Sequence, residues 1–364
     1  MSEDLRSQYL DEIDHSAKKG LALPASCYRD PAFFELEREH VLRPGWHPIA
    51  RWDTLAEPGD YRAVDLFGEP LVIVRGDDAR LRVFSNVCRH RAHTVASGMG
   101  NAKSLVCPYH RWTYGLDGAL RGAPLMDELP DFDRAHCGLP ELPTESWQGF
   151  LMVNLGHDSA NRAKPTSVEQ SLAGLDKRID SYDLGGMVTL GVLDFDSPWN
   201  WKVMVDNFME SYHHIGIHLD TLQKTNPAKD TYAGESDEFY SLLENPGIKG
   251  APAFLVAQIF PSFLIAVFDG DHFASWYEME IDRHDHIHLR IHIMAPPAFK
   301  ETEGAADALL DIATKVHLED IPACEAVQRG ITSQLWQPGP LSPQEDCLAQ
   351  FHRHLAARLR SGLA

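Results

Sequence analysis

The chain has 364 residues, of which 44% are hydrophobic, so it is long enough for roughly two or three domains with cores. Its formal net charge of −20 argues against nucleic acid as a partner, because phosphate binding needs cationic patches. No run of about 18 apolar residues predicts a membrane span. The acidic residues 1–5 lack the apolar centre of a secretory signal, and four of the six cysteines are scattered without a spacing pattern. We therefore expect a cytoplasmic protein that binds neither nucleic acid nor membranes.

The first half of the chain predicts a helical segment followed by strands. Asp30 followed by Pro31 predicts a helix in which Asp30 is the N-cap and Pro31 is the first helical residue. From about 45 to 155, short apolar runs alternate with turns rich in glycine and aspartate, and residues 149–155 form a closing strand. This pattern predicts a small all-β domain over 45–155, preceded by an N-terminal helical segment over 1–44.

The second half predicts a mixture of helices and antiparallel strands. A polar connection over 156–168 leads into a helix near 166–182. Residues 263–294 alternate with period two, as antiparallel strands do. The end of the chain is helical, including 302–318 and 343–360. The fold class is therefore α+β.

One of these strands carries a row of basic side chains. His286, His288 and His292, with Arg290, share one face by alternation. Three histidines on a strand can bind a metal, but such a row is more often a solvent face or a subunit contact, which we expect here. The opposite face should be core, and it consists of Ile287, Leu289, Ile291 and Ile293.

The most specific motif is the pair Cys88-x-His90 and Cys107-x-x-His110. Thiolates on one iron and neutral imidazoles on the other make a Rieske-type [2Fe–2S] centre, which carries one electron at a time. The competing interpretation is a structural zinc site. Zinc sites of this composition usually keep the two cysteines together and the two histidines together, whereas here each half contributes one of each. We therefore favour the iron–sulfur cluster.

A second constellation follows Asn200. On a helix, Glu210 and His213 share a face, and for both His213 and His218 to reach one ion the helix must end between them, where Gly216 permits a break. Two imidazoles and a carboxylate with open positions are typical of a mononuclear Fe(II) that activates O₂. The alternative is a polar helix end with chance histidines. Because a one-electron cluster needs an acceptor and an O₂-activating iron needs a donor, each motif supports the other.

The third iron ligand cannot be chosen by spacing alone. Glu210, Asp206 and a distant carboxylate in the segment Glu319–Gly330 all qualify. The cavity for a substrate should be lined by large apolar side chains, although each is at least as well explained as core: Phe208, Met209, Phe254, Phe263 and Trp276.

Along nearly its whole length, the chain resembles the large (α) subunit of a Rieske non-haem iron oxygenase. The resemblance rests on the two metal motifs in this order and on further matching segments, namely Leu23-Pro24, Tyr28, Pro58-Gly59-Asp60-Tyr61, Asn200-Trp201-Lys202 and Glu325–Gly330. It implies a Rieske β-domain set into a helix-grip catalytic domain, an antiparallel sheet with a long helix, that covers 156–364.

The resemblance also implies roles for the site residues. Cys88, His90, Cys107 and His110 would hold the cluster. His213, His218 and Asp320 would hold the iron. Glu210 would link that iron to the cluster of the neighbouring subunit in a ring-shaped homotrimer.

Three departures from the family pattern stand out. Most members have glycine after the second cluster histidine, where this chain has Arg111, and many have glycine where it has Ala92-His93. The linking carboxylate is commonly aspartate in aromatic-ring dioxygenases. Glu210 is similar to what oxygenases of quaternary ammonium compounds carry, which favours betaine-like amines as substrates.

The resulting expectation is a terminal oxygenase that uses O₂ to hydroxylate or demethylate a small organic substrate. No glycine-rich dinucleotide fingerprint is present, so electrons should come from a separate NAD(P)H-dependent reductase, with or without a ferredoxin. Three alternatives remain: a ring cis-dihydroxylating α subunit that needs a β partner, a Rieske electron carrier without oxygenase activity, and a zinc-stapled binding module. Iron content separates either kind of oxygenase, at about three irons per chain, from a carrier, at two, and a zinc-stapled module would contain zinc instead.

Overall fold

The computed structural model describes residues 3–156, 166–270 and 273–361. The chain forms two compact units. The small unit is Gly45–Val168, and the large unit combines Met1–Pro44 with Glu169–Ala364, so the small unit is inserted into the sequence of the large one. The expected polar connection over 156–168 falls mostly outside the described residues.

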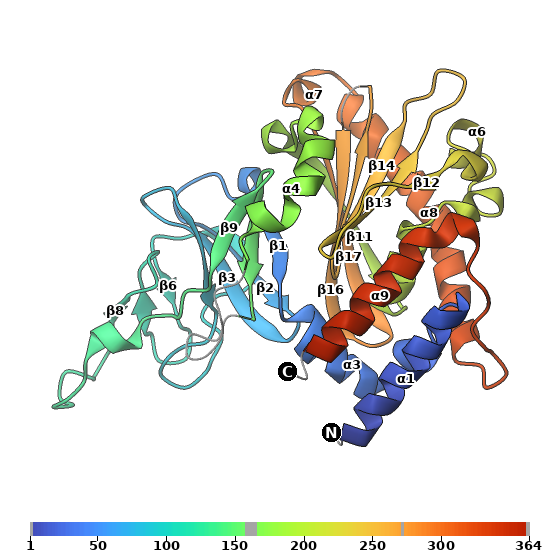
Figure 1. The fold of residues 1–364 in the computed structure, drawn as a ribbon. Helices are drawn as coiled ribbons and strands as arrows, with labels where there is room; N and C mark the ends of the chain where they lie inside the picture. The colour runs from blue at the N-terminus through green and yellow to red at the C-terminus, as the bar shows by residue number, and fades with distance from the viewer. Residues whose placement is uncertain (1–2, 157–165, 271–272, 362–364) are drawn as a thin grey trace. The chain divides into compact units, whose positions relative to one another are not determined.

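The small unit is built from short antiparallel strands (Figure 1). A four-stranded sheet has the order β4-β3-β2-β5, and two three-stranded sheets have the orders β1-β10-β9 and β6-β7-β8. The strands are β1 (Trp46–Arg51), β2 (Asp60–Leu66), β3 (Glu69–Arg75), β4 (Leu81–Ser85), β5 (Met99–Asn101), β6 (Leu105–Val106), β7 (Thr113–Tyr114), β8 (Leu120–Gly122), β9 (Thr144–Trp147) and β10 (Phe150–Asn154). The predicted strands are confirmed, including the closing one, which is β10.

Alternation along β3 gives the small unit two hydrophobic clusters. Leu71 and Ile73 point into one, which packs against residues of β1 and β10. Val72 and Val74 point into the other, because successive side chains of a strand face opposite sides. The second cluster also contains Cys88 and Cys107 among its buried members. The loops that carry the cysteines are therefore fixed by the core of the unit.

The large unit contains a seven-stranded antiparallel sheet of order β11-β17-β16-β15-β14-β13-β12. Its strands are β11 (Val188–Ser197), β12 (Tyr232–Ala233), β13 (Tyr240–Asn245), β14 (Phe254–Ile259), β15 (Phe263–Phe268), β16 (Phe273–Arg283) and β17 (His286–Ala295). The three strands expected over 263–294 are β15, β16 and β17. Their registers pair Ile265 with Trp276, and Tyr277 with Ile291.

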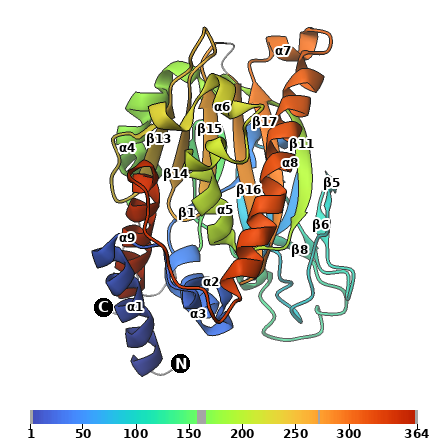
Figure 2. The same cartoon turned by 90° about the vertical axis from the view of Figure 1, so that its right-hand side faces the viewer.

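Helices complete the large unit (Figures 1 and 2). They are α1 (Glu3–Lys19), α2 (Ser26–Arg29), α3 (Pro31–Glu37), α4 (Val168–Ile179), α5 (Trp201–Phe208), α6 (Leu222–Thr225), α7 (Ala298–Glu301), α8 (Ala305–Ile331) and α9 (Asp346–Ser361). Helix α8 packs against α5 and against β11 and β17, whereas α9 lies beside α1 and packs against β13. Helix α8 continues well past the expected end at 318, through Pro322.

The N-terminal segment is anchored to α5 by a buried ion pair. Helix α3 begins at Pro31, and the side chain of Asp30 accepts a hydrogen bond from the backbone N–H of Ala32, as predicted. At the other end of α3, Glu37 Oε2 lies 2.7 Å from Lys202 Nζ, and both side chains are fully buried. A buried pair of this kind depends on both partners, because either charge alone would be left without compensation.

The basic row on β17 is only partly a solvent face. His286 and His288 are partly exposed and pair with Asp196 and Asp194 of the neighbouring strand β11. His292 is buried and stacks on Trp276 at 4.3 Å between ring centroids, so the expectation of solvent exposure is wrong for this residue. The opposite set, from Ile287 to Ile293, is fully buried, as predicted.

Candidate active site

Two loops of matching geometry carry the cysteine–histidine motifs. The first lies between β4 and β5 and the second between β6 and β7. In each, a backbone N–H reaches back to the carbonyl of the cysteine, from Ala92 to Cys88 and from Arg111 to Cys107, at 3.0 Å in both cases. Ala92 and Arg111 have φ values of 57° and 62°, in the left-handed region that favours glycine. The conformation that glycine would adopt freely is thus imposed here on residues with a Cβ.

The four side chains of these loops suit a cluster with mixed ligands. His90 Nδ1 lies 3.1 Å from His110 Nδ1, so both rings direct the same nitrogen toward one point. Cys88 and Cys107 are buried, and burial, followed by the neighbouring Cys88, raises the pKa of the Cys107 thiol. Two buried thiols beside two convergent imidazole nitrogens fit thiolates on one iron and imidazoles on the other.

Aromatic side chains surround these ligands unequally. Trp112 is buried and stacks on His90 with an interplanar angle of 11°. Tyr114 places its hydroxyl 3.3 Å from Cys88 Sγ. Tyr109, in contrast, is half exposed and has the guanidinium of Arg91 over its ring. Trp112 therefore screens His90 from water, whereas Tyr109 lies on the surface.

In the large unit, helix α5 ends earlier than the sequence analysis expected. Asn200 caps it by accepting a hydrogen bond from the backbone N–H of Lys202, and the helix stops at Phe208. Glu210 therefore lies outside the helix, and the expected end between His213 and His218 is wrong. Gly216, the expected position of the break, has a φ of −118° and lies beyond the end of α5. The chain instead makes a single 3₁₀ turn over Tyr212–Ile215.

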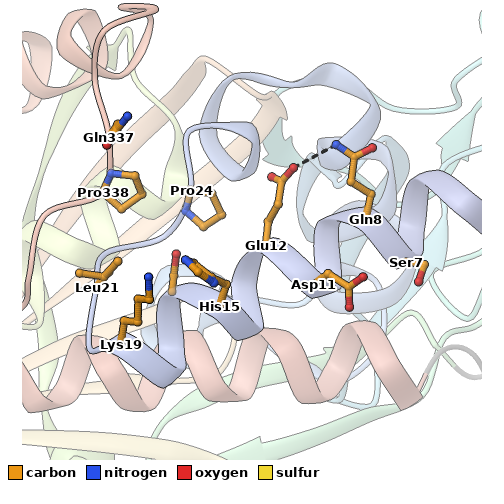
Figure 3. A pocket seen from close by; sticks show the side chains of 11 residues that line it. Ser7, Gln8, Asp11, Glu12, His15, Lys19, Leu21, Pro24, Gln337 and Pro338 are labelled. Atoms are coloured by element: carbon orange, nitrogen blue, oxygen red, sulfur yellow. Dashed lines mark hydrogen bonds between the residues drawn. The ribbon is translucent and has the colours of Figure 1, made fainter.

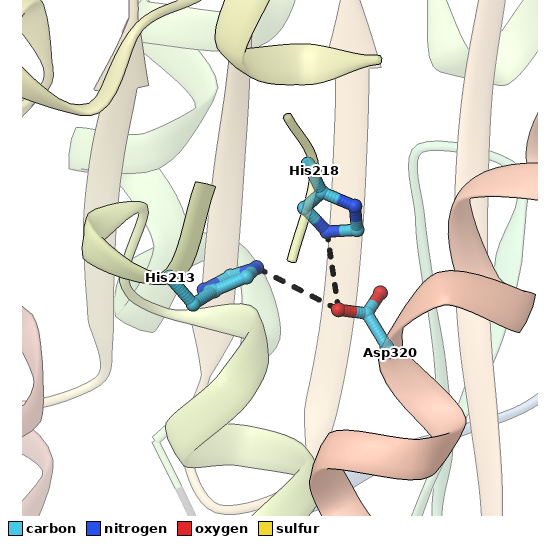
Figure 4. Close-up of side chains that lie close together, drawn as sticks. All are labelled: His213, His218 and Asp320. Carbon is cyan, nitrogen blue, oxygen red and sulfur yellow. Dashed lines mark ion pairs between the residues drawn. The ribbon is translucent and has the colours of Figure 1, made fainter. Parts of the chain in front are cut away.

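This turn and helix α8 bring three ligand atoms together (Figure 4). The donor atoms of His213, His218 and Asp320 all lie within 4.8 Å of one another. Asp320 Oδ1 is 3.1 Å from His218 Nε2 and 3.7 Å from His213 Nε2. Burial alone would raise the pKa of Asp320, but its contacts with the two histidines outweigh that effect and lower it. A buried carboxylate facing two imidazoles can hold a divalent iron with positions left open.

Two further carboxylates orient the histidines. Glu210 Oε1 lies 2.7 Å from His213 Nδ1, and its other oxygen accepts the backbone N–H of the same residue. Glu319 Oε2 lies 2.7 Å from His218 Nδ1. Each histidine therefore directs Nε2 toward Asp320 while its Nδ1 is held by a carboxylate, an arrangement that fixes the ring and raises its basicity as a ligand.

The other carboxylates that had been open as third ligand have different contacts. Asp206 accepts a hydrogen bond from the hydroxyl of Tyr28 at 2.5 Å. Glu325 lies on the C-terminal part of α8, beyond Asp320. His214 stands next to the site, but its Nδ1 is 3.0 Å from the carbonyl of Asn226, and burial lowers its pKa to about 3.

A cavity of about 130 Å³ opens onto the three ligand residues. Phe208 and Phe254 line it, as expected, but Met209, Phe263 and Trp276 do not and are buried elsewhere. The sequence analysis missed several lining residues, chiefly Phe268, Phe273, Ser275 and Tyr277. Alternation along β16 separates Ser275 and Tyr277 from Trp276, so a period-two pattern was available to group them.

A second hollow, of about 770 Å³, lies along helix α1 (Figure 3). Its lining comes from α1, from the segment that follows it and from Gln337 and Pro338. None of the three ligand residues is among its lining residues.

Comparisons with known proteins agree with this geometry. Residues 45–133 match the family described as Rieske [2Fe-2S] domain. Residues 184–247 and 239–361 match the ring hydroxylating alpha subunit (catalytic domain). The carnitine monooxygenase oxygenase subunit of Acinetobacter baumannii is 31% identical over 328 residues, which cover 85% of each chain. The chloroplastic choline monooxygenase of Arabidopsis thaliana is 27% identical, over 90% of this chain and 81% of that one.

Solved structures give the same result. The crystal structure of a quaternary ammonium Rieske monooxygenase superposes with a TM-score of 0.85 and 26% identity, over 96% of this chain and 98% of that one. Naphthalene 1,2-dioxygenase from Rhodococcus shares the fold, with a TM-score of 0.81 at 19% identity.

The chain belongs to the Rieske non-haem iron oxygenases. Within that family it is an oxygenase (α) subunit, an oxidoreductase that uses O₂ and carries a Rieske [2Fe–2S] cluster and a mononuclear iron site. Its relatives are oxygenase subunits of multicomponent systems, which implies a reductase partner. Among the residues that the structure describes, no helix is both long and apolar enough to cross a membrane.

Proposed function

We propose that this subunit oxidises a quaternary ammonium compound at a carbon bound to nitrogen, with electrons from a separate NAD(P)H-dependent reductase. The observation that carries the proposal is the cavity at the His213, His218 and Asp320 ligands, which has several aromatic rings in its walls. Aromatic faces are the usual protein surface for a quaternary ammonium group. The carnitine and choline monooxygenases among its relatives act on compounds of this class.

The site residues divide into two groups by their roles. Cys88, His90, Cys107 and His110 would hold the cluster. His213, His218 and Asp320 would hold the iron. When bound, the cluster would supply electrons and the iron would supply oxygen activation.

The protein itself fixes geometry and excludes water. Glu210 and Glu319 hold the Nδ1 atoms of the two histidines, so that each Nε2 stays directed at Asp320. The apolar side chains of the sheet line the cavity and keep the substrate beside the ligands with little water. Glu210 would also connect the site to the cluster of a neighbouring subunit, in a homotrimer. This link is supported by its contact with His213 and by its place in the cavity wall.

The cytoplasm is the location that fits this assignment. The four cysteines outside the cluster motif, namely Cys27, Cys137, Cys324 and Cys347, form no disulfide in the structure, which is compatible with a reducing compartment.

Iron analysis followed by single turnover tests the proposal. The reconstituted protein should contain about three irons per chain. Reduced anaerobically and then exposed to O₂, it should oxidise a quaternary ammonium compound from a panel that also contains aromatic acids, with product mass as the readout. Two irons per chain would identify an electron carrier instead. A product with two added hydroxyls from an aromatic acid would identify a ring dioxygenase.

A matched variant controls for chemistry outside the iron site. His213→Ala should lose the third iron and all product while the visible absorbance of the cluster remains. Product formation by this variant would contradict the assignment of the site.

A further inference from the structure

The sheet side of the active-site cavity carries no formal charge among the described residues. The strands β14, β15 and β16 direct every second side chain toward the cavity, which gives an uninterrupted neutral surface. These side chains are Phe254 and Val256 of β14, Ala266 and Phe268 of β15, and Phe273, Ser275 and Tyr277 of β16.

On the opposite side of the cavity, the charged residues that the structure describes are acidic, apart from the histidines. Glu210 and Asp320 line it, and none of the described lining residues is a lysine or an arginine. The nearby strand β17 does carry Arg290, but its guanidinium pairs with Glu278 and Glu280 instead of reaching the cavity. Because Asp320 would hold the iron, the like charge left for a substrate carboxylate to meet is that of Glu210, and no lysine or arginine among the described lining residues could pair with such a carboxylate.

Aromatic rings form two groups among the described lining residues of the cavity. Phe208 and Tyr277 pack edge to face, with 4.8 Å between ring centroids, and both line the cavity together with the ligand residues. Burial, followed by the nearby charge of Asp320, raises the pKa of Tyr277, which agrees with a place at the ligand end. Phe268 stacks on Phe273 at 4.1 Å and on Phe254 at 5.0 Å. Cation–π attraction between an ammonium group and an aromatic ring is stronger in such a desolvated setting than at an exposed site.

Polar groups in the cavity suit a neutral tail better than a charged one. Ser211 donates its hydroxyl to Asn245, and Asn207 donates to Asp320, so both are already engaged. Ser275 is buried on the sheet face, and its hydroxyl can both donate and accept. A single hydroxyl can satisfy an alcohol, whereas a desolvated carboxylate needs several donors or a cation.

We infer that the cavity selects quaternary ammonium compounds whose tail is uncharged, such as an amino alcohol, and discriminates against betaines that end in a carboxylate. The inference rests on the proposed function and narrows its substrate class. It assigns Ser275 as the residue that meets the polar end of the tail.

Equilibrium binding to the iron-loaded protein under nitrogen tests this selection with matched ligands. Choline and glycine betaine differ only by a CH₂OH group in place of a carboxylate. γ-Butyrobetaine and 4-hydroxybutyl-trimethylammonium form the corresponding longer pair. By calorimetry, the alcohol should bind at least about tenfold more tightly than the carboxylate in at least one pair and never more weakly in either, a difference of about 1.4 kcal/mol.

The outcomes separate this inference from the proposed function. If neither alcohol binds about tenfold more tightly than its carboxylate partner, or if a carboxylate binds more tightly in either pair, the selection is overturned and the proposed function stands. If none of the four ligands binds but a neutral aromatic compound does, the proposed function itself fails.

Substitution of the sheet face adds a second test. Ser275→Lys places a cation on the neutral wall and should reverse the preference within a pair. Choline should bind this variant more weakly, and glycine betaine should bind it more tightly. Ser275→Ala should weaken the alcohols about five- to tenfold and leave the carboxylates unchanged, because it removes one hydrogen bond. It keeps a small buried side chain, so it tests the role of Ser275 even if the lysine variant does not fold. Equal loss for both ligands of a pair in Ser275→Ala would contradict that role.

Discussion

His218 and Glu319 form a contact of 2.7 Å between Nδ1 and Oε2, on the side of the imidazole ring opposite the one that faces Asp320. Two adjacent carboxylates of helix α8 thus contact the two ring nitrogens of one histidine. Thr221 also donates its hydroxyl to the same oxygen of Glu319, at 2.5 Å. The orientation of the iron ligand His218 therefore depends on a residue that would not touch the metal.

Replacing Glu319 by alanine should weaken iron binding at the three-residue site by about 10- to 100-fold, because the outer partner of a metal-bound histidine fixes its ring and tautomer. Iron content after dialysis against a chelator of known affinity measures the change. Asp311→Ala, at an exposed position on the same helix, is the control and should bind iron normally. Unchanged affinity in Glu319→Ala would show that the ring is held by its own packing.

Replacing Glu210 by glutamine should separate electron delivery from iron binding. The amide oxygen can still accept from His213 Nδ1, so both metal sites should stay filled, but the negative charge is lost. Turnover with the reductase should fall at least about tenfold. Single turnover of protein that was reduced chemically beforehand should change much less. Full metal content with unchanged turnover in both this variant and Glu210→Ala would rule out a linking role.

His317 should make the stability of the large unit depend on pH. It is buried, neither ring nitrogen has a hydrogen-bond partner among the described residues, and burial lowers its pKa from 6.5 to about 4. Between these values the unfolded chain binds a proton that the folded chain does not, so stability is present above pH 6.5 and is lost as the pH falls to 4. The loss amounts to about 3 kcal/mol.

His317→Phe should remove this part of the acid sensitivity. Unfolding measured at pH 7 and at pH 4.5 should show a smaller difference for the variant than for the natural chain. His214, whose pKa burial also lowers, remains in both proteins and contributes the same slope to each. An identical pH dependence in the two proteins would show that water reaches His317.

Lys202→Met should destabilise the protein by about 3–5 kcal/mol, because it leaves Glu37 buried without its partner. The double variant Lys202→Met with Glu37→Leu should recover most of that loss, since an apolar pair of similar volume can replace a buried ion pair. Chemical denaturation of the single and double variants measures the coupling. Simple addition of the two single losses would show that the pair is not energetically coupled.

The left-handed conformation of Arg111 also has a measurable cost. Arg111→Val should lose stability relative to Arg111→Gly by about 1–2 kcal/mol, because a β-branched residue is strained at a φ of 62°. Thermal loss of the visible absorbance of the cluster reports on this loop. Arg80 is exposed and is not among the non-glycine residues with positive φ, so Arg80→Val and Arg80→Gly should not show the same difference.

The sequence predicted best what depends on short stretches of chain. Period-two alternation is a local property, and the strands β15, β16 and β17 follow it closely. Each half of the motif around Cys88 and Cys107 lies within a single loop, so it could also be recognised from a short stretch of sequence. The capped helix at Asp30 was equally local, since one side chain bonds a backbone N–H two residues away.

What depends on packing could not be derived from spacing. Glu319 and Asp320 are adjacent carboxylates, and only the way α8 packs decides which one faces the Nε2 atoms of both histidines. In the same way, alternation shows that Trp276 and Tyr277 point to opposite faces of β16, but not which face borders the cavity. The early end of α5 was missed because the helical pattern continues through Glu210 in the sequence, while the chain turns to bring His213 and His218 to one point.

The insertion of the small unit within the large one has a consequence for synthesis on the ribosome. Residues 45–168 emerge as one continuous stretch and can fold as soon as they leave the exit tunnel. The segment made first, which contains Glu37, must wait for Lys202 to be translated before its charge is neutralised. The packing of helix α1 is delayed further, because its Asp14 pairs with Arg360, which is translated 346 residues later. A nascent chain stalled before its final helix should therefore expose its earliest helix to chaperones and proteases while its electron-carrying module is already native.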